Sequence, residues 1–511
     1  MLTKRDISYL KSINKDVLLV EQQLNCFKEE NVHNLSVARP ASLGDGIHKF
    51  SLKEQNEFKD FFDLNSSSLS ITKFIPASGL ASRMFYFLRD FISNFKVSQD
   101  DLDSYLIDSR NKDFQFFVNN IEAFPFYGLI EKRLNNSNNT FDNRADFLYQ
   151  FIEVLLKDPE IGMEGIAKGL LPIFIDLDGY DVTGLELHIL ESLNLFSNSS
   201  KAKIHFTLDA DQIQSFIKVE NSLMNKLSVK DQNRLQIEYS FQDARTDSIA
   251  LLENRSMLRD SDGEIIFRKS GHGALIENIR RFKADLIFIK TVDSIKPNDM
   301  ESVDVQKFMG GLYLNRYDQV ADLLVELKKQ TKTCVNESLA FIRENLHIDL
   351  SEKLNQVSFK KQTIIMRDFL NRPLRVCGMI ENEGKPGGGP FWIKQDDALA
   401  LQIVEAVELQ SSKIDLDKAS FFNPVNMVCG LKDFEGEPWD LDEFIDSRRN
   451  LISIKKINSQ SIKVIELPGL WNGSMAYWNS IFVQIPKTTF RSLKTINDCF
   501  RIKKGLTLCF L

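Results

Sequence analysis

Short apolar runs alternate with helical patterns between residues 71 and 290, and no other feature limits the possible folds so strongly. Five of these runs predict buried strands, at 71–76, 170–175, 204–208, 235–241 and 286–290. Stretches with apolar residues three and four apart lie between them and predict helices over 84–95, 184–196, 210–226 and 274–282. Because parallel strands need crossover connections, the alternation predicts an α/β fold with a mostly parallel, Rossmann-like sheet covered on both faces.

The rest of the chain shows other patterns. An apolar stripe from Ile7 to Phe27 predicts one helix of about 20 residues, and residues 39–46 predict a loop. Further helices are expected near 52–62, 317–329 and 337–346. We therefore divide the chain into an N-terminal helical appendage (1–70), an α/β domain (71–300) with a helical insertion (96–165), a helical connection (301–372) and a mixed α/β lobe (373–511).

Composition and charge disfavour several classes of protein. Lys and Arg number 64 against 71 Asp and Glu, and the net charge of −7 gives no electrostatic footprint for nucleic acid. No apolar stretch approaches the ~18 residues of a membrane span, and the N-terminus lacks the apolar segment of a signal peptide. The 6 Cys form no CxxC pair and the 6 His are scattered, which disfavours a zinc site and predicts reduced thiols. We expect a cytoplasmic protein.

The first candidate for chemistry follows the strand predicted at 71–76. Ala77, Ser78, Gly79 and Ser82 lead into a helix that carries Arg83 in its first turn. Small side chains let backbone N–H groups approach an anion, and the helix N-terminus and the guanidinium add positive charge. The pattern predicts a phosphate-binding loop; the alternative is a tight turn whose arginine is merely solvated.

Two charged residues stand at the ends of other predicted strands. Lys168 precedes the strand at 170–175, where its ammonium would reach a phosphate over the sheet edge, although Lys-Gly pairs are common. Asp293 follows the strand at 286–290. Open α/β sheets bind ligands at the carboxyl ends of their strands, so this carboxylate would hold Mg²⁺ or, alternatively, cap the next segment.

A hairpin signal at Asp262-Gly263 leads to Gly271, His272 and Gly273 at the start of a predicted helix. Two glycines that flank a polar side chain would let a planar or sugar ligand approach the backbone closely.

The C-terminal lobe offers substrate contacts and a metal ligand. Contacts to substrate are predicted for Arg375, Glu383, Gly387, Gly388 and Asn423. A Gly triplet between two prolines would expose backbone donors, and Glu383 would accept from sugar hydroxyls; a purely structural loop is the alternative. The amide oxygen of Asn426 is the expected partner of Asp293 at the metal.

Taken in order, these motifs resemble the sugar-nucleotide pyrophosphorylases, above all the UDP-sugar and UDP-N-acetylhexosamine pyrophosphorylases. The likeness covers residues 71–295. The whole chain also resembles a bacterial domain-of-unknown-function family, number 4301, with Pro76–Met84, Lys168–Pro172, Gly271–Asn278 and Asn382–Trp392 as signature stretches. The resemblance implies a GT-A-like nucleotidyltransferase domain that joins an NTP, with UTP favoured, to a sugar 1-phosphate and releases pyrophosphate, with Mg²⁺ as cofactor.

The resemblance also implies roles for single residues. It assigns base and triphosphate to the loop Ala77–Arg83, the transferred phosphate to Lys168, the uracil edge to Gln242, the nucleoside or sugar to Gly271–Gly273, and the metal to Asp293.

Departures from the family keep other functions open. Ser78-Gly79-Leu80-Ala81 replaces the usual Gly-Gly-x-Gly, and Ala167-Lys168 replaces the usual Pro-Lys. Glycosyltransferases hold a nucleotide sugar and Mn²⁺ through Asp-x-Asp triplets such as Asp176-Leu177-Asp178 and Asp209-Ala210-Asp211, although the second triplet also fits a helix start. A glycosyltransferase and a non-catalytic sugar-nucleotide-binding protein are therefore the alternatives.

Overall fold

The computed structural model describes residues 2–29, 35–97, 101–136, 140–176, 181–382, 388–395, 398–409, 419–457, 460–491 and 493–500. Its contacts divide the chain into two compact units, each assembled from separate stretches of sequence. Unit 1 consists of Met1–Thr72, Ser240–Ile289 and Val305–Lys487, and unit 2 consists of Lys73–Tyr239, Lys290–Asp304 and Thr488–Leu511. The consecutive segments expected from the sequence do not coincide with these units.

Unit 2 holds most of the strand and helix elements that the alternating pattern predicts. Its helices are α4 (Tyr86–Asn94), α5 (Leu102–Ile107), α6 (Lys112–Asn119), α7 (Tyr127–Asn136), α8 (Arg144–Lys157), α9 (Gly184–Leu195), α10 (Ile213–Met224), α11 (Val229–Arg234) and α17 (Asn497–Phe500). Its strands are β4 (Ile71–Pro76), β5 (Pro172–Ile175), β6 (Asp181–Thr183), β7 (Ala202–Leu208) and β8 (Leu235–Phe241), of which β4 and β8 extend by two residues into unit 1.

The strands β4, β7 and β8 are neighbours in that order. The bounds of β4 and β8 are those expected from the apolar runs, so these two predictions are confirmed. The run at 170–175 behaves differently, because β5 pairs only with β6, in the antiparallel direction, and forms a separate two-stranded sheet. An apolar run predicts burial but does not identify the partner strand, which is why it was assigned to the main sheet.

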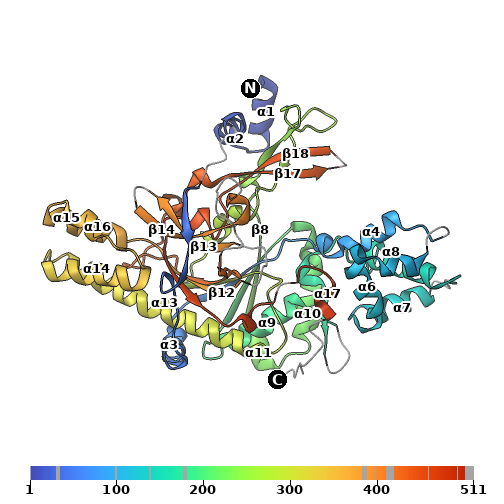
Figure 1. Ribbon diagram of the computed structural model, residues 1–511, viewed down its shortest axis with the longest axis horizontal. Helices are drawn as coiled ribbons and strands as arrows, with labels where there is room; N and C mark the ends of the chain where they lie inside the picture. The colour runs from blue at the N-terminus through green and yellow to red at the C-terminus, as the bar shows by residue number, and fades with distance from the viewer. Residues whose placement is uncertain are drawn as a thin grey trace. The chain divides into compact units, whose positions relative to one another are not determined.

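The segment predicted as a helical insertion, 96–165, contains the helices α5 to α8, and α4 precedes it. The helices α4, α6, α7 and α8 gather together in Figure 1, around a core that contains many phenylalanines. The ring of Phe91 stacks against Phe95 at 4.7 Å and against Phe114 at 4.3 Å between centroids. Aromatic pairs at this spacing add to the stabilisation from burial alone. The same core also includes Ile173 of β5, Val182 of β6 and Leu187 of α9, so the insertion packs against the rest of unit 2.

Unit 1 combines several sheets with two groups of helices. Its helices are α1 (Lys4–Ser12), α2 (Val17–Glu29), α3 (Leu52–Asn65), α12 (Ile276–Ile279), α13 (Met300–Leu327), α14 (Lys332–Leu346), α15 (Ser351–Asn355) and α16 (Phe359–Leu370). Its strands are β1 (Val37–Pro40), β2 (Ser42–Leu43), β3 (Gly46–His48), β9 (Ser248–Leu252), β10 (Phe267–Arg268), β11 (Leu286–Lys290), β12 (Leu374–Glu381), β13 (Gly389–Gln395), β14 (Ala398–Val404), β15 (Phe421–Phe422), β16 (Asn426–Cys429), β17 (Leu451–Ile457), β18 (Gln460–Glu466) and β19 (Asn479–Gln484). Lys290 of β11 and the first turn of α13, up to Asp304, belong to unit 2.

The main sheet of unit 1 is mixed rather than mostly parallel. Its order is β2-β3-β19-β12-β16-β11. The strand β12 runs parallel to β19 and antiparallel to β16, and β19 runs parallel to β3. Two further sheets, β1-β13-β14 and β10-β9-β18-β17, are antiparallel throughout. The α/β class is therefore confirmed, but the mostly parallel arrangement is not, because the C-terminal strands pair mainly as hairpins.

The N-terminal residues depart from the single predicted helix. Asn14 has the left-handed φ of 56°, a conformation that Asn tolerates better than most residues, and it separates α1 from α2. Both helices still use the predicted apolar stripe, since Leu10, Val20 and Phe27 pack with Ile249 of β9. The loop expected at 39–46 overlaps the strands β1, β2 and β3. The strand β1 pairs with β13 and β3 pairs with β19, while β2 pairs with β3.

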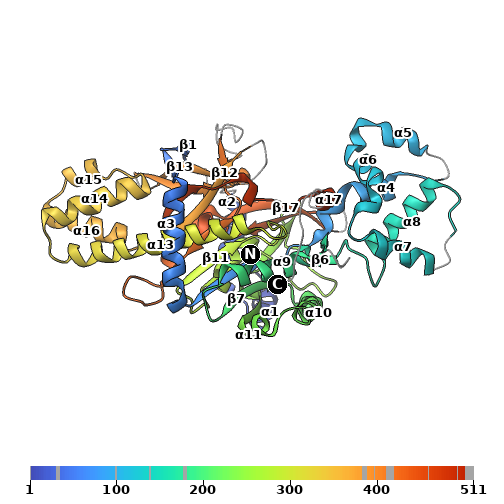
Figure 2. The same cartoon turned by 90° about the horizontal axis from the view of Figure 1, so that it is seen from below.

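The helix α13 begins well before the predicted position of residue 317. Two glycines inside it, Gly310 and Gly311, look like helix breakers in the sequence. In the structure they allow α3 to approach, because a Cβ on Gly311 would lie 1.7 Å from the carbonyl oxygen of Phe58. Figure 2 shows α3 crossing α13. Within the described residues, no helix is both long and apolar enough to cross a membrane.

Candidate functional site

The loop that follows β4 is held against the segment that precedes β5, and both belong to unit 2. The N–H of Lys168 donates to the carbonyl of Gly79 at 2.9 Å, and the N–H of Ala81 donates to the carbonyl of Ile166 at 2.9 Å. The hydroxyl of Ser82 donates to the carbonyl of Glu164 at 2.8 Å. Two motifs that the helical insertion separates in sequence therefore form one continuous backbone structure.

A third motif joins them through an ion pair. The Nζ of Lys168 lies 2.9 Å from Oδ2 of Asp293, and both side chains keep a solvent-exposed fraction, of 20% and 24%. At the next residue, a Cβ on Gly169 would lie 3.0 Å from Cγ2 of Val292, so the glycine lets the segment that carries Lys168 approach the segment that carries Asp293. The structure thus brings together Lys168 and Asp293, two of the charged residues that the sequence predicts for the phosphate and the metal.

The loop after β4 also has an exposed arginine and a glycine with free space around it. Arg83 is exposed in the 3₁₀ turn η2 (Ala81–Phe85), and within the part of the chain that the structure describes no carboxylate forms an ion pair with it. A Cβ added to Gly79 would meet no atom within 4 Å. Among the described residues, no neighbouring atom requires a glycine at this position, in contrast to Gly169. A glycine here would instead allow a ligand to approach the backbone closely.

Sequence reasoning missed a buried charge cluster in unit 2. Lys73 of β4 and Lys290 of β11 both pair with Glu191 of α9, and the hydroxyl of Ser302 donates to the same carboxylate. All these side chains are buried. Burial lowers the pKa of Lys73 to about 8, although the charge of Glu191 opposes this shift. The only signal was a lysine inside each of two otherwise apolar runs.

This cluster is linked to the candidate site by a histidine. His188 of α9 is fully buried, and burial, together with the charge of Lys73, holds its pKa well below the usual value. The neutral ring donates from Nε2 to the carbonyl of Val292 at 3.2 Å. Because Val292 precedes Asp293, this hydrogen bond fixes the backbone that carries the candidate metal ligand.

The Gly-His-Gly motif lies in unit 1 and contacts the chain around Trp471. The ring of His272 stacks on Trp471 at 4.1 Å, its Nδ1 accepts from the N–H of Leu470 at 3.0 Å, and its Nε2 faces Glu405 at 3.1 Å. Burial acts to raise the pKa of Glu405, but the His272 and Trp471 hydrogen bonds outweigh it and the pKa is lowered. Both ring nitrogens of His272 therefore have protein partners.

The fold of unit 1 also requires the two flanking glycines, Gly271 and Gly273. Gly271 has a φ of 78°, which a residue with a side chain rarely adopts. A Cβ on Gly273 would lie 2.3 Å from the carbonyl oxygen of Pro468. Contact with a nucleoside or sugar stays a prediction for this motif, since the fold alone accounts for both glycines.

Predicted substrate residues of the C-terminal lobe lie in the interior. Arg375 is fully buried, and it donates to Ser480 Oγ at 2.7 Å and to the carbonyl of Trp471 at 2.6 Å. Burial lowers its pKa. Asn423 donates to the carbonyl of Gly378 at 3.0 Å, and its own N–H donates to the carbonyl of Gly388 at 2.8 Å. These groups hold the lobe together instead of facing a cavity, while Glu383 and Gly387 lie outside the described residues.

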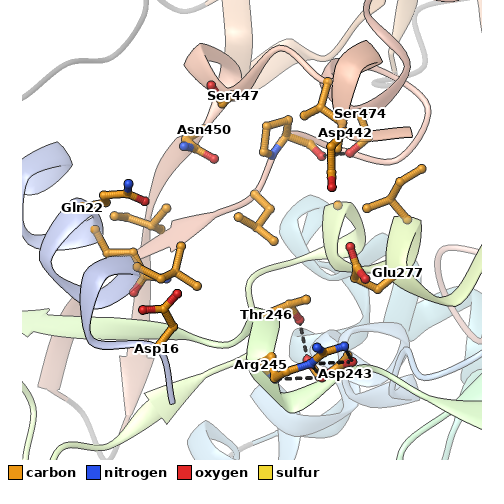
Figure 3. A pocket seen from close by; sticks show the side chains of 18 of the residues that line it. Asp16, Gln22, Asp243, Arg245, Thr246, Glu277, Asp442, Ser447, Asn450 and Ser474 are labelled. Atoms are coloured by element: carbon orange, nitrogen blue, oxygen red, sulfur yellow. Dashed lines mark hydrogen bonds and ion pairs between the residues drawn. The ribbon is translucent and has the colours of Figure 1, made fainter. Parts of the chain in front are cut away.

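Gln242 follows β8 and is half-buried in unit 1. Its Nε2 is buried and has no hydrogen-bond partner among the described residues. The next residue, Asp243, lines a cavity of about 880 Å³ in unit 1, together with Arg245, Thr246 and Gly273 (Figure 3). The predicted base-reading residue thus directly precedes a residue that lines this cavity, and its buried amide nitrogen lacks a partner among the described residues.

The predicted metal ligands are divided between the units, with Asp293 in unit 2 and the buried Asn426 in unit 1. Within the described residues, no group of three or more His, Cys, Asp and Glu has the arrangement of a metal site. Mg²⁺ commonly uses only one or two carboxylates, with water and substrate phosphates as the remaining ligands. The carboxylate of Asp293 is partly exposed, and its partner Lys168 has a long, flexible side chain, so Asp293 fits such a site.

Comparison with solved structures finds distant likenesses. The chain is similar to UDP-N-acetylglucosamine pyrophosphorylase from Trypanosoma brucei, with 10% identity, a TM-score of 0.46, and coverage of 94% of this chain and 74% of that one. It is also similar to UDP-glucose pyrophosphorylase from Leishmania major, with 11% identity, a TM-score of 0.44, and coverage of 98% and 79%. A putative UDP-N-acetylglucosamine pyrophosphorylase from Entamoeba histolytica shows 12% identity, a TM-score of 0.41, and coverage of 87% and 82%.

No curated protein matches the chain. One family model does match, over residues 3–504, and it spans nearly all of the segments described above. The protein therefore belongs to the family described as Domain of unknown function (DUF4301), as its signature stretches suggested.

Proposed function

We propose that this protein is a nucleotidyltransferase that joins an NTP, preferentially UTP, to a sugar 1-phosphate and releases pyrophosphate. The observation that carries the proposal is the meeting of three distant motifs in unit 2. The carbonyl of Gly79 accepts from Lys168, and the ammonium of Lys168 pairs with Asp293 at 2.9 Å. A small-residue loop, a cation and a carboxylate are the groups that a triphosphate and its metal require.

In the proposed reaction, an oxygen of the sugar phosphate attacks the α-phosphorus in line and pyrophosphate leaves. No covalent intermediate on the protein is needed, so the chain acts by positioning the reactants and neutralising charge. In the loop Ala77–Gly79, the N–H of Ala77 donates to the carbonyl of Thr207 at 2.8 Å, so the N–H groups of Ser78 and Gly79 would be the ones near the phosphates. The exposed Arg83 would supply a planar donor. Lys168 would leave Asp293 and contact the transferred phosphate as a point charge.

Asp293 would hold Mg²⁺, and the bound ion would neutralise charge on the phosphate oxygens. His188 supports that role through its hydrogen bond to the carbonyl of Val292. It keeps the end of β11 in place without contacting the reacting groups.

The preference for UTP rests on Gln242. An amide presents both a donor and an acceptor, which matches the neighbouring acceptor and donor on the uracil edge. Its buried Nε2 has no partner within the described residues, so a base that reaches it would supply the missing acceptor. A site built to hydrogen-bond a substrate group rejects analogues that lack that group.

The structure gives little support to the alternative of a glycosyltransferase that uses an Asp-x-Asp triplet. Asp209 is the N-cap and Asp211 lies in the first turn of the 3₁₀ turn η6 (Ala210–Gln212), which leads into α10, so both acids stand where helix starts favour negative charge. In the other triplet, Leu177 and Asp178 lie outside the described residues.

The proposal is tested by mixing the purified protein with each of the four NTPs and a panel of sugar 1-phosphates in the presence of Mg²⁺. We expect pyrophosphate to appear only when both substrates are present, and fastest with UTP. A glycosyltransferase would instead consume a nucleotide sugar, and a binding protein would bind nucleotide sugars without turnover. Absence of pyrophosphate with every pair would contradict the proposal.

A further inference from the structure

The cavity of about 880 Å³ lies wholly in unit 1. The turn between α1 and α2 and the first turns of α2 form one wall. The others come from the loop after β8, the start of α12, the loops at 442–450 and the end of β18. In Figure 3, Gln22, Asp16 and Asn450 lie on one side of the cavity, and Glu277 and Asp442 lie on the other. The volume falls within the range of sites for small molecules.

The cavity offers no free positive charge. Its described lining contains two cations, Lys15 and Arg245, and four carboxylates, Asp16, Asp243, Glu277 and Asp442. Arg245 pairs with Asp243 at 2.7 Å, and Lys15 donates to the carbonyl of Ala244 and lies 3.8 Å from Asp247. A phosphate placed here would meet more negative than positive charge, so the lining disfavours phosphorylated ligands.

Two polar atoms of the lining residues lack partners. Gln23 has an exposed fraction of 5%, and its Oε1 accepts from the N–H of Ile249 at 3.0 Å, which fixes the orientation of the amide. Its Nε2 donor has no hydrogen-bond partner among the described residues, and neither does the acceptor Oδ1 of Asn450. A buried donor or acceptor without a partner costs roughly 1–3 kcal/mol, so a ligand that pairs with both groups would remove that cost.

The remaining lining is apolar. Leu19, Ile276, Ile445, Ile465, Leu467 and Pro468 line the cavity, and no aromatic ring occurs among its described lining residues. A ligand would therefore bury a nonpolar body and use its edge for hydrogen bonds. Stacking on a ring would contribute nothing.

We propose that this cavity binds an uncharged small molecule that carries an acceptor for Gln23 and a donor for Asn450, such as the hydroxyl and amide groups of a free amino sugar derivative or nucleoside. This function goes beyond the proposed nucleotidyl transfer, because every substrate and product of that reaction carries phosphate. The site also uses none of the residues assigned to phosphate or metal in unit 2. It would serve an effector or a further substrate that lacks charge.

Cys26 provides a reporter inside the cavity. It lines the cavity and is half-buried, whereas Cys334, Cys377, Cys429 and Cys499 are buried. The full-length protein would be treated with iodoacetamide, and alkylation of the Cys26 peptide would be followed by mass spectrometry. The probes are uridine and N-acetylglucosamine, each compared with its phosphorylated counterpart, UMP and N-acetylglucosamine 1-phosphate.

We expect at least one uncharged probe to slow alkylation of Cys26, by roughly tenfold at ten times its Kd, while its phosphorylated counterpart protects far less. Gln23→Met should weaken protection roughly three- to tenfold, the value of one neutral hydrogen bond. Gln214→Met, the same change at an exposed position of α10 outside the cavity, should leave protection unchanged. If Gln23→Met fails to fold, Asn450→Ala tests the same prediction at a half-buried position.

Three outcomes would overturn the proposal: no protection by either uncharged probe, equal protection in Gln23→Met and Gln214→Met, or protection by the phosphorylated probe as strong as by its uncharged form. Addition of saturating UTP separates the two sites. Protection that UTP abolishes would place the probe in the nucleotide site and contradict a separate one. The pyrophosphate assay reports independently on the transferase function.

Discussion

Lys168 and Asp293 form an ion pair in the structure. A divalent cation that binds the carboxylate of Asp293 must therefore compete with an ammonium group 2.9 Å away. We predict that Lys168→Met, which removes this competitor, binds Mn²⁺ roughly tenfold more tightly than the wild type, a change of about 1.4 kcal/mol. Asp293→Asn should lose most of the binding. Electron paramagnetic resonance titration of Mn²⁺ measures both. Unchanged affinity in Lys168→Met would mean that the two cations do not share the carboxylate.

Substitution of Gly79 tests whether a glycine at this position serves ligand binding or the fold. A Cβ at Gly79 or at Gly165 would meet no atom within 4 Å, so alanine at either position should leave the melting temperature unchanged or slightly raised. If nucleotide phosphates approach the loop, Gly79→Ala should lower kcat/KM roughly tenfold, equivalent to about 1.4 kcal/mol. The control Gly165→Ala should retain full activity. Equal activity of the two variants would remove Gly79 from the site.

Residue types at strand ends predicted part of the candidate site. A cation before one apolar run and a carboxylate after another identified Lys168 and Asp293, because sheet topology brings strand ends together. Arg375 shows the limit of that reasoning. Its charge suggested substrate contact, but the fold buries it against Ser480 and Trp471, which are far away in sequence. Lys73, Glu191 and Lys290 were missed because nothing local distinguishes a buried charge network from solvated charges.

At the scale of elements, the helix α1 is held to the hairpin around Gly263 by the exposed Arg5, which pairs with Glu264, and by the buried carboxylate of Asp6. The hydrogen bond from Arg259, at 2.7 Å, lowers the pKa of Asp6 to about 2, with help from Thr3 and against the effect of burial. The folded-state pKa thus lies below the unfolded value of about 3.9. The resulting stability is present above pH 4 and is lost as the pH falls toward 2.

Asp6→Asn should therefore lower the free energy of unfolding by about 1–2 kcal/mol at pH 7 and by much less near pH 2. Urea unfolding at both pH values measures the difference. Asp60→Asn, at an exposed position of α3, is the matched control and should change little at either pH. A loss in Asp6→Asn that stays the same from pH 7 to pH 2 would show that the carboxylate charge does not stabilise α1.

The contact between α3 and α13 depends on the absence of side chains at Gly310 and Gly311. A Cβ on Gly311 would overlap the carbonyl of Phe58, which is backbone and cannot rotate away. We expect Gly311→Ala to destabilise unit 1 by roughly 1–3 kcal/mol, the usual cost of overpacking. Gly128→Ala, which would meet no atom within 4 Å, is the control. Thermal melting that does not distinguish the two variants would contradict this close approach.

Elements with a strong local pattern were predictable, and elements defined by distant partners were not. The strands β4 and β11 match their apolar runs residue for residue, because strands that are buried along their length are largely apolar. The bounds of β8 also match the prediction, although its residues are only half-buried or exposed. In contrast, β1 and β3 are short and partly polar, and they form only because β13 and β19 supply their hydrogen bonds. The pattern also joined α1 to α2, since an apolar stripe does not reveal the turn at Asn14.

At the scale of the whole molecule, the two units are each assembled from stretches that lie far apart in the chain. Sequence patterns describe consecutive residues, so they suggested an appendage, a domain, a connection and a lobe. Residues 1–72 belong instead to unit 1, together with residues from the middle and the end of the chain. The predicted family is nevertheless confirmed, because signature stretches are short and local and do not depend on how the units are assembled.

The central claim, that this chain transfers a nucleotidyl group with Lys168 at the phosphate, is tested most directly by measuring both products of one reaction. Pyrophosphate and nucleotide sugar would be quantified from UTP and the best sugar 1-phosphate, for the wild type, Lys168→Met and Lys218→Met, an exposed lysine of α10. We predict equal amounts of the two products in the wild type and Lys218→Met, and a rate roughly 10²–10³ lower in Lys168→Met. Full turnover in Lys168→Met, or nucleotide sugar formed without pyrophosphate, would contradict the account.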